Sequence, residues 1–208
     1  MAINQTIVEA LTVLDEATLY DEVKRAVAAG DDRMDILASL QEGMAAIGTL
    51  YANREYFLSE LMLSAEIFQE CQELIGGELD SDAQYGTFVI GTVAGDVHDI
   101  GKNIVASIFR SSGFKVVDLG IDVPTENFIA AIKEHDAKVV GLSCLLTTAY
   151  PSMQDIISQM RSTGLDEGRI IMIGGGPVDE STVARVGADF FSFSVQEAVD
   201  KAIEFVTA

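Results

Sequence analysis

The sequence predicts a two-part α + α/β protein: an N-terminal four-helix bundle followed by a flavodoxin-like (Rossmann-like), doubly wound domain with a five-stranded parallel sheet. Three observations support this fold. Apolar residues recur every three or four positions through residues 1–77, as in amphipathic helices. Residues 86–208 alternate short β-branched runs with stretches of helical periodicity, which is typical of a parallel sheet covered on both faces. Residues 78–85 are mostly polar and predict a linker.

Four amphipathic helices are expected in the first part, and short turns between them favour a bundle. Gly30 suits the end of the second helix, and Asp31 or Asp32 suits the cap that begins the third. The four apolar stripes are Ile7, Val8, Leu11 and Leu14; Leu19, Val23, Ala26 and Val27; Ile36, Leu37, Leu40, Met44, Ile47, Leu50 and Tyr51; and Phe57, Leu58, Leu61, Met62, Ala65, Phe68, Cys71 and Leu74.

Five strands are expected in the second part, at 87–93, 115–119, 138–142, 169–173 and 189–191. Helical stretches separate them, so consecutive strands should run parallel. In open sheets of this kind, ligands bind at the loops that follow the carboxyl ends of the strands. Functional residues are therefore sought in those loops.

Composition narrows the classes of partner. The chain has 13 basic and 33 acidic residues, a net charge of −20, which argues against nucleic acid or an anionic membrane surface as a partner. No apolar run is long enough to suggest a membrane span, and the N-terminus does not resemble a signal peptide. Two cysteines, Cys71 and Cys144, lie in apolar stretches and predict packed thiols in a reducing, cytoplasmic compartment.

The loop after the first strand holds the principal candidate site. His98 lies between Asp96 and Asp99, and Gly95 and Gly101 bound the loop. A phosphate-binding P-loop needs four residues between its glycines and then Lys and a hydroxyl residue, whereas here five residues separate the glycines and Asn103 follows Lys102. The glycine spacing of a dinucleotide site is also absent. The loop therefore favours a histidine-centred site.

The chemistry of these residue types supports a metal ligand. Neutral imidazole is a common ligand of transition metals. A carboxylate hydrogen-bonded to the other ring nitrogen fixes the tautomer and raises basicity, and Asp96 is the candidate for that role. The alternative is that His98 only satisfies a hydrogen bond within the loop.

The string D-x-H-x-x-G, extended here to GDVHDIGKN with VVDLGIDVP downstream, resembles corrinoid-binding domains, specifically the methyl-carrying corrinoid proteins and the cobalamin domain of methionine synthase. The resemblance implies a cobalamin or related corrinoid, as methylcobalamin or hydroxocobalamin, with His98 as the lower axial ligand of cobalt. It places the cofactor against the loop residues Gly95, Asp96, Val97, His98, Asp99, Ile100 and Gly101.

Further motifs carry the resemblance along most of the chain. Ser143, Leu145 and Thr147 match the family's S-x-L region, where hydroxyls line the channel for the nucleotide tail, and Gly174 and Gly175 match its GG motif. In the helical half, the match implies that Tyr51, Leu58 and Leu61 contact the upper face of the cofactor.

Two positions depart from methionine synthase. Leu37 replaces an acidic residue, and Ala149 replaces the serine that ends a histidine–aspartate–serine relay, a role that Thr148 is positioned in sequence to take.

The function implied by the resemblance is that of a methyl carrier rather than a free-standing enzyme. Its expected partners are a substrate:corrinoid methyltransferase, a methylcorrinoid:acceptor methyltransferase and an ATP-dependent reductive activator. The methyl donor would be methanol, a methylamine, a betaine or a methoxyarene, and the acceptor a folate or a thiol. Two alternatives are a cobalamin-responsive sensor, which the acidic charge disfavours, and a flavodoxin-like redox protein or a carbohydrate- or nucleotide-processing enzyme.

Overall fold

The computed structural model describes residues 3–76 and 83–208 and divides the chain into two compact units. The first holds the chain through Gln84, and the second holds nearly all the rest. Most of the predicted linker, 78–85, lies outside the described residues, so this boundary stays a prediction.

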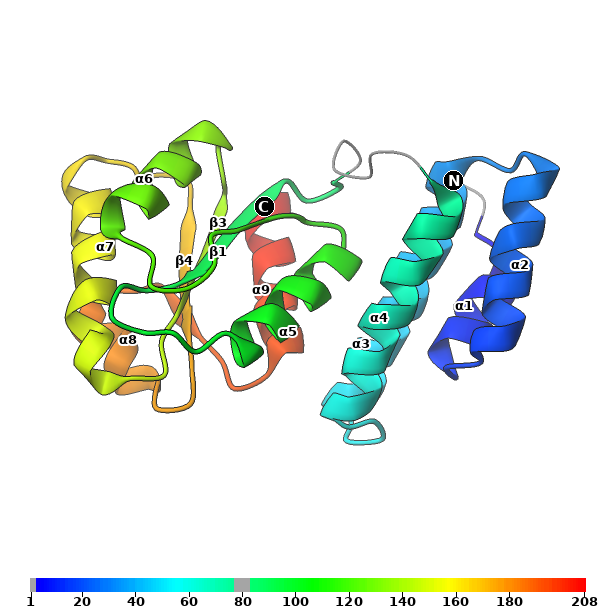
Figure 1. Ribbon diagram of the computed structural model, residues 1–208, viewed down its shortest axis with the longest axis horizontal. Helices are drawn as coiled ribbons and strands as arrows, with labels where there is room; N and C mark the ends of the chain where they lie inside the picture. Colours follow the sequence, from blue (N-terminus) through cyan, green and yellow to red (C-terminus); the bar gives the residue numbers. More distant parts are fainter. Residues whose placement is uncertain (1–2, 77–82) are drawn as a thin grey trace. The chain divides into compact units, whose positions relative to one another are not determined.

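The first unit contains the four expected helices (Figure 1). They are α1 (Gln5–Thr12), α2 (Glu16–Ala29), α3 (Arg33–Ala52) and α4 (Leu58–Ile75). Helix α1 packs against α2 and α3, and α4 packs against the same two helices. The side chains of Leu11, Leu19, Leu40 and Phe68 are fully buried, one from each predicted stripe. The fourth stripe is only partly buried, because Phe57, Leu58, Met62 and Leu74 are exposed.

The predicted helix ends in this unit are confirmed. Gly30 ends α2 with φ at 79°, a left-handed conformation that glycine adopts without strain. Asp32 caps α3, because its carboxylate accepts a hydrogen bond from the N–H of Met34 at 2.8 Å.

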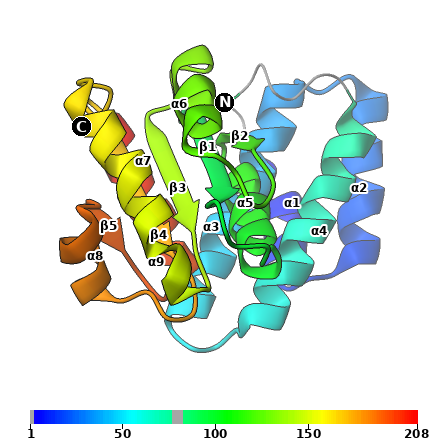
Figure 2. The ribbon, with the colours of Figure 1, turned by 60° about the vertical axis from the view of Figure 1, so that its left-hand side comes forward.

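The second unit is built on a five-stranded parallel sheet in the order β2-β1-β3-β4-β5 (Figure 2), the flavodoxin-like order. The strands are β1 (Thr87–Thr92), β2 (Lys115–Asp118), β3 (Val139–Ser143), β4 (Ile170–Gly174) and β5 (Phe190–Phe191). Each lies within one residue of its predicted position at either end. The predicted fold class is thus confirmed.

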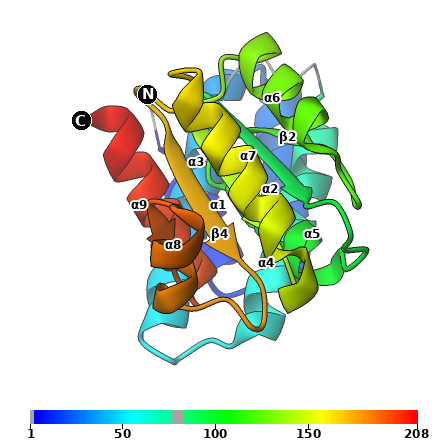
Figure 3. The same ribbon diagram turned by 90° about the vertical axis from the view of Figure 1, so that its left-hand side faces the viewer.

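Helices cover both faces of the sheet. The helices of this unit are α5 (Ile100–Ser111), α6 (Thr125–Glu134), α7 (Tyr150–Ser162), α8 (Glu180–Val186) and α9 (Val195–Thr207), with a short 3₁₀ turn, η2, at Thr147–Ala149. Helix α7 lies between α6 and α8 on one face (Figure 3), and α5 and α9 lie on the other (Figure 1). Among the described residues, no helix combines the length and apolar character needed to cross a membrane.

Strand order decides which loops meet at the carboxyl edge of the sheet. Strand β1 lies between β2 and β3, so the loops that follow these three strands are neighbours. An isolated parallel bridge between Val93 and Val123 extends this pairing beyond β1. The His98 loop therefore lies between the loops that carry Asp122 and Leu145.

Candidate functional site

His98 is held by its own neighbour in the loop. Its Nδ1 lies 2.7 Å from Oδ1 of Asp96, and its main-chain N–H donates to the same oxygen at 3.0 Å. The His98 side chain is 49% exposed, whereas that of Asp96 is fully buried. The loop thus fixes one ring nitrogen on a buried carboxylate and leaves the ring half open to solvent.

The carboxylate of Asp96 accepts four hydrogen bonds. Besides the two from His98, its Oδ2 accepts from the N–H groups of Leu145 at 2.5 Å and Leu146 at 2.9 Å. Burial by itself raises the pKa of Asp96, but the hydrogen bonds from His98, Leu146 and Leu145 outweigh it and hold the pKa below its ordinary value. Asp96 therefore stays ionised and acts only as an acceptor.

This arrangement selects the tautomer of His98. A carboxylate that only accepts requires the proton of a neutral imidazole ring on Nδ1, which leaves the lone pair on Nε2. Within the described chain, Nε2 has no hydrogen-bond partner. The ring thus offers one nitrogen as a ligand, and that is the donor a metal in a tetrapyrrole ring takes from a protein histidine.

Neighbouring elements fix the main chain of the loop. The hydroxyl of Thr92, at the end of β1, donates to the carbonyl of His98 at 2.8 Å. Asp122, in the loop after β2, accepts from the N–H of Gly95 at 2.8 Å and donates its own N–H to the carbonyl of Asp96 at 2.9 Å. Asp122 has φ at 50°, a left-handed conformation that is uncommon for a residue with a side chain. In this conformation Asp122 makes both hydrogen bonds to the His98 loop.

Apolar side chains are exposed around His98. They come from the loops after β1, β2 and β3, and they are Val97 (62% exposed), Ile100 (76%), Ile121 (45%), Leu145 (41%) and Leu146 (38%). A cluster of exposed apolar side chains around one polar group is typical of a ligand site. The cluster suits a broad apolar ligand with a central atom that the Nε2 of His98 can coordinate.

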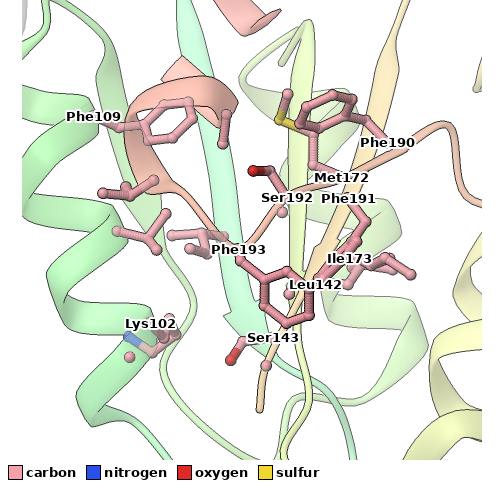
Figure 4. Close-up of a pocket in the computed structure, with 18 of the residues that line it drawn as sticks. Lys102, Phe109, Leu142, Ser143, Met172, Ile173, Phe190, Phe191, Ser192 and Phe193 are labelled. Atoms are coloured by element: carbon pink, nitrogen blue, oxygen red, sulfur yellow. The ribbon is translucent and has the colours of Figure 1, made fainter. Parts of the chain in front are cut away.

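A cavity of about 340 Å³ opens in the same unit, between the sheet and the two helices α5 and α9. Lys102 and Ser143 lie toward one end of it, and Phe109 and Phe190 lie toward the other (Figure 4). Its full lining is Phe88, Ile90, Gly101, Lys102, Val105, Phe109, Gly141, Leu142, Ser143, Met172, Ile173, Gly174, Gly175, Gly176, Phe190, Phe191, Ser192, Phe193, Ser194, Val195 and Ala198. The size lies in the usual range of small-molecule sites.

Gly175 lets two loops meet at this cavity. Its φ is 139°, and a Cβ atom at this position would lie 1.8 Å from the carbonyl oxygen of Cys144. No side chain fits there without a shift of the backbone. The glycine run after β4 is therefore required by the close approach to the segment after β3.

Lys102 is a charged residue in an apolar wall. Its side chain is 2% exposed, and its ammonium lies 2.5 Å and 2.7 Å from the two carboxylate oxygens of Asp118 and 2.7 Å from Oδ1 of Asn103. Asp118 also accepts from the N–H of Gly120 at 2.9 Å. The pair joins the first turn of α5 to the end of β2.

The structure gathers the predicted residues in two places. Gly95, Asp96, Val97, His98, Asp99 and Ile100 form the loop and the start of α5, where Leu145 is bonded to Asp96. Gly101, Ser143, Gly174 and Gly175 line the cavity, whereas Thr147 begins η2 and does not line it. In the helical unit, Tyr51 is half-buried, Leu58 is exposed and Leu61 is buried, so their contact with a cofactor stays a prediction.

Thr148 does not take the place of the relay serine that Ala149 replaces. Main-chain N–H groups of Leu145 and Leu146 occupy Oδ2 of Asp96, and the hydroxyl of Thr148 makes no hydrogen bond to it in the described chain. Ala149 is buried near Gly95. The second oxygen of Asp96 is thus held by backbone.

Sequence reasoning missed Lys102, Asp122 and most of the aromatic lining. A signal for Lys102 was present, because Lys102, Val105 and Phe109 recur at helical spacing and so share one face of α5. Asp122 carries no such signal, since its role depends on the loop that faces it.

Comparisons with known proteins identify the family. A family model described as a B12 binding domain matches residues 86–204, and a second model of the same description matches residues 3–74. The chain is 37% identical to dimethylamine corrinoid protein 1 of Methanosarcina acetivorans, over 89% of this chain and 91% of that protein. It is 35% identical to the trimethylamine corrinoid protein of Methanosarcina barkeri, over 93% and 91% of the two chains.

Solved structures similar to this chain are also those of cobalamin proteins. A cobalamin-binding protein from Desulfitobacterium hafniense superposes with a TM-score of 0.80 at 33% identity, covering 97% of both chains. The methanol:cobalamin methyltransferase complex MtaBC from Methanosarcina barkeri matches with a TM-score of 0.83 at 29% identity, covering 98% of this chain and 79% of that one.

Proposed function

This chain belongs to the family of B12-binding corrinoid proteins, and from that membership we propose that it carries a methyl group between two methyltransferases. Its cofactor is a cobalamin or related corrinoid, which contains cobalt. The observation that carries the proposal is the half-exposed ring of His98, which is fixed on buried Asp96 and offers Nε2 as a ligand.

In this proposal His98 is the protein ligand of cobalt, and Asp96 orients its ring and fixes the tautomer that leaves Nε2 free to bind. The bound corrinoid supplies a cobalt centre that accepts a methyl group and gives it up again. The residues of this chain bind and orient that group. Hydrogen bonds from Thr92 and to Asp122 hold the loop, and the apolar side chains Val97 and Ile100 exclude water beside it.

The cavity beside α5 and α9 is proposed to take the nucleotide tail of the corrinoid. It opens among residues matched to the family's tail channel, Ser143, Gly174 and Gly175, and its apolar walls suit a ring system. Tyr51, Leu58 and Leu61 of the helical unit are proposed as further contacts of the cofactor.

The proposed partners are a substrate:corrinoid methyltransferase, a second methyltransferase that passes the methyl group to a folate or a thiol, and an ATP-dependent reductive activator. Relatives named for dimethylamine and trimethylamine, and a structural neighbour from a methanol system, make methylamines and methanol the first donors to test. Betaines and methoxyarenes remain in the proposed donor class.

The test is reconstitution of the full chain with hydroxocobalamin, using His98→Ala and, as a matched control, His135→Ala. The parent and His135→Ala should show histidine coordination in the absorbance spectrum and in the electron paramagnetic resonance of the reduced cobalt(II) form. His98→Ala should lose that signature and retain cobalamin at least about tenfold less tightly, since loss of a partner that only supports a metal ligand already costs roughly 10–100-fold. An unchanged spectrum in His98→Ala would overturn the proposal.

A further inference from the structure

The lining of the cavity is nearly devoid of available polar side chains. Four of its side chains are polar: Lys102, Ser143, Ser192 and Ser194. The remaining lining residues are apolar or glycine, and five of them are phenylalanines: Phe88, Phe109, Phe190, Phe191 and Phe193. What a ligand can bond to in this cavity therefore depends on these four residues and on main chain.

Lys102 has no hydrogen left to donate. An ammonium has three N–H groups, and the Lys102 ammonium meets three oxygens, two from Asp118 and one from Asn103. The carboxylate of Asp118 also balances its charge. A ligand in the cavity would gain a hydrogen bond from Lys102 only by breaking one of these.

Of the three serines, the hydroxyl of Ser192 both donates and accepts a hydrogen bond in the described chain, whereas that of Ser194 only accepts one. The hydroxyl of Ser192 donates to a carboxylate oxygen of Glu197 at 2.5 Å and accepts from the N–H of Ser194 at 2.9 Å. The oxygen of Ser194 accepts from the N–H of Glu197 at 3.4 Å as the cap of α9. Among the described residues, Ser143 alone of the four has a side chain without a hydrogen bond.

Aromatic pairs shape the walls. Phe88 and Phe109 are stacked with ring centroids 4.1 Å apart, and Phe191 meets Phe193 edge to face at 4.7 Å. Such walls favour a flat aromatic group by dispersion and by burial of apolar area. Phenylalanine rings provide no hydrogen-bond partner for an amino group or a ring nitrogen that loses its water on entering the cavity.

We infer that this cavity selects corrinoids by the chemistry of their lower base, accepting an apolar benzimidazole and disfavouring a purine. The inference rests on the proposed function, since it concerns the tail of the same cofactor. Adenine carries an amino group with two N–H donors and several ring nitrogens, more polar groups than the hydroxyls of Ser143 and Ser194 can pair, whereas the carbocyclic half of dimethylbenzimidazole needs no partner. A polar group buried without a partner is strongly unfavourable.

The experiment measures the affinity of the full-length apoprotein for three corrinoids by titration, followed by absorbance. The corrinoids are cobalamin, the cobamide with adenine as its lower base, and cobinamide, which has no base. We expect cobalamin to bind at least about tenfold more tightly than the adenine cobamide, as one unpaired polar group implies. Cobinamide should bind more weakly than cobalamin, because it leaves the cavity unfilled.

The outcomes separate the two proposals. Equal affinity for cobalamin and the adenine cobamide overturns the inference alone. Affinity for cobinamide equal to that for cobalamin overturns both the inference and the assignment of the tail to the cavity. Failure of all three corrinoids to bind overturns the proposed function.

A variant tests the role of the lining itself. Met172 lines the cavity and Met34 is exposed on α3, so Met172→Gln introduces an amide into the cavity and Met34→Gln is the matched control. Met172→Gln should reduce the preference for cobalamin over the adenine cobamide at least threefold, and Met34→Gln should leave it unchanged. An unaltered preference in a folded Met172→Gln protein counts against the inference; if that variant does not fold, the parent titration decides.

Discussion

The ammonium of Lys102 lies between the two carboxylate oxygens of Asp118, 16 residues further along the chain. The lysine is in the first turn of α5, where a positive charge opposes the helix dipole. It is nevertheless buried, so Asp118 must offset both the dipole and the loss of water. This pair connects the helix that follows the His98 loop to the neighbouring strand.

Removing one partner should therefore destabilise the fold. Lys102→Met leaves Asp118 without its cation and should lower the free energy of unfolding by about 3 kcal/mol. Adding Asp118→Asn removes the unpaired charge while keeping an acceptor for Gly120, and should recover most of that loss. Urea denaturation of the three proteins measures the effect, and a single-variant loss below about 1 kcal/mol would contradict it.

Asp96→Asn should impair the site more than its small change of shape suggests. All four groups that meet this carboxylate are donors, so the amide nitrogen of asparagine must face N–H groups whichever way it turns. We expect cobalamin affinity to fall about 10–100-fold. Asp21→Asn is the control, since Asp21 is exposed on α2 and lies outside the proposed site. Equal cobalamin titrations for the two variants would refute the assigned role of Asp96.

Gly175→Ala should disrupt the loops at the mouth of the cavity. The added methyl group would overlap the carbonyl of Cys144, so the backbone must move, and we expect a loss of about 2 kcal/mol or more of unfolding free energy. Gly174→Ala is the comparison, because a Cβ there meets open space. Thermal unfolding curves that coincide for the two variants would show that the close approach is not needed.

Leu58→Ala tests the proposed contact of α4 with the cofactor. Leu58 is 44% exposed, so its truncation should change stability by less than about 1 kcal/mol. If Leu58 contacts the cofactor, photolysis of the methylated holoprotein should be faster in the variant. Leu63→Ala, on the same helix and 37% exposed, is the control. Equal photolysis rates in Leu58→Ala and Leu63→Ala would remove Leu58 from the site.

The helical unit should also show a pH dependence that traces to Glu22. Hydrogen bonds from Arg25 and Asn4 lower the pKa of Glu22 from 4.5 to about 2. A lowered pKa stabilises the folded state above the unfolded value, and this contribution is lost as pH falls from about 4.5 towards about 2. The stability difference between the parent and Glu22→Gln should therefore be present at pH 6 and shrink through that window. A difference that stays constant from pH 6 to pH 2 would contradict the assignment.

The sequence by itself determined the secondary structure and the central residues of the site. Periodicity places the helices and strands, because it reports which face of each element is buried. The short distance from Asp96 to His98 along the chain made their pairing predictable, since two residues of one tight loop meet whatever the rest of the fold does. Gly30 and Asp32 were predictable as helix ends for the same local reason.

Tertiary structure decided everything that depends on neighbours distant in sequence. Leu145 and Leu146 donate to Asp96 across 49 and 50 residues, because the sheet places β3 beside β1. Asp118 becomes the partner of Lys102, and Asp122 that of Gly95, because β2 flanks β1 on its other side. Spacing along the chain carries no information about strand order, so the backbone anchor of Asp96, the buried ion pair and the contribution of Phe88, Phe109 and Phe190 to the cavity became visible only in the folded molecule.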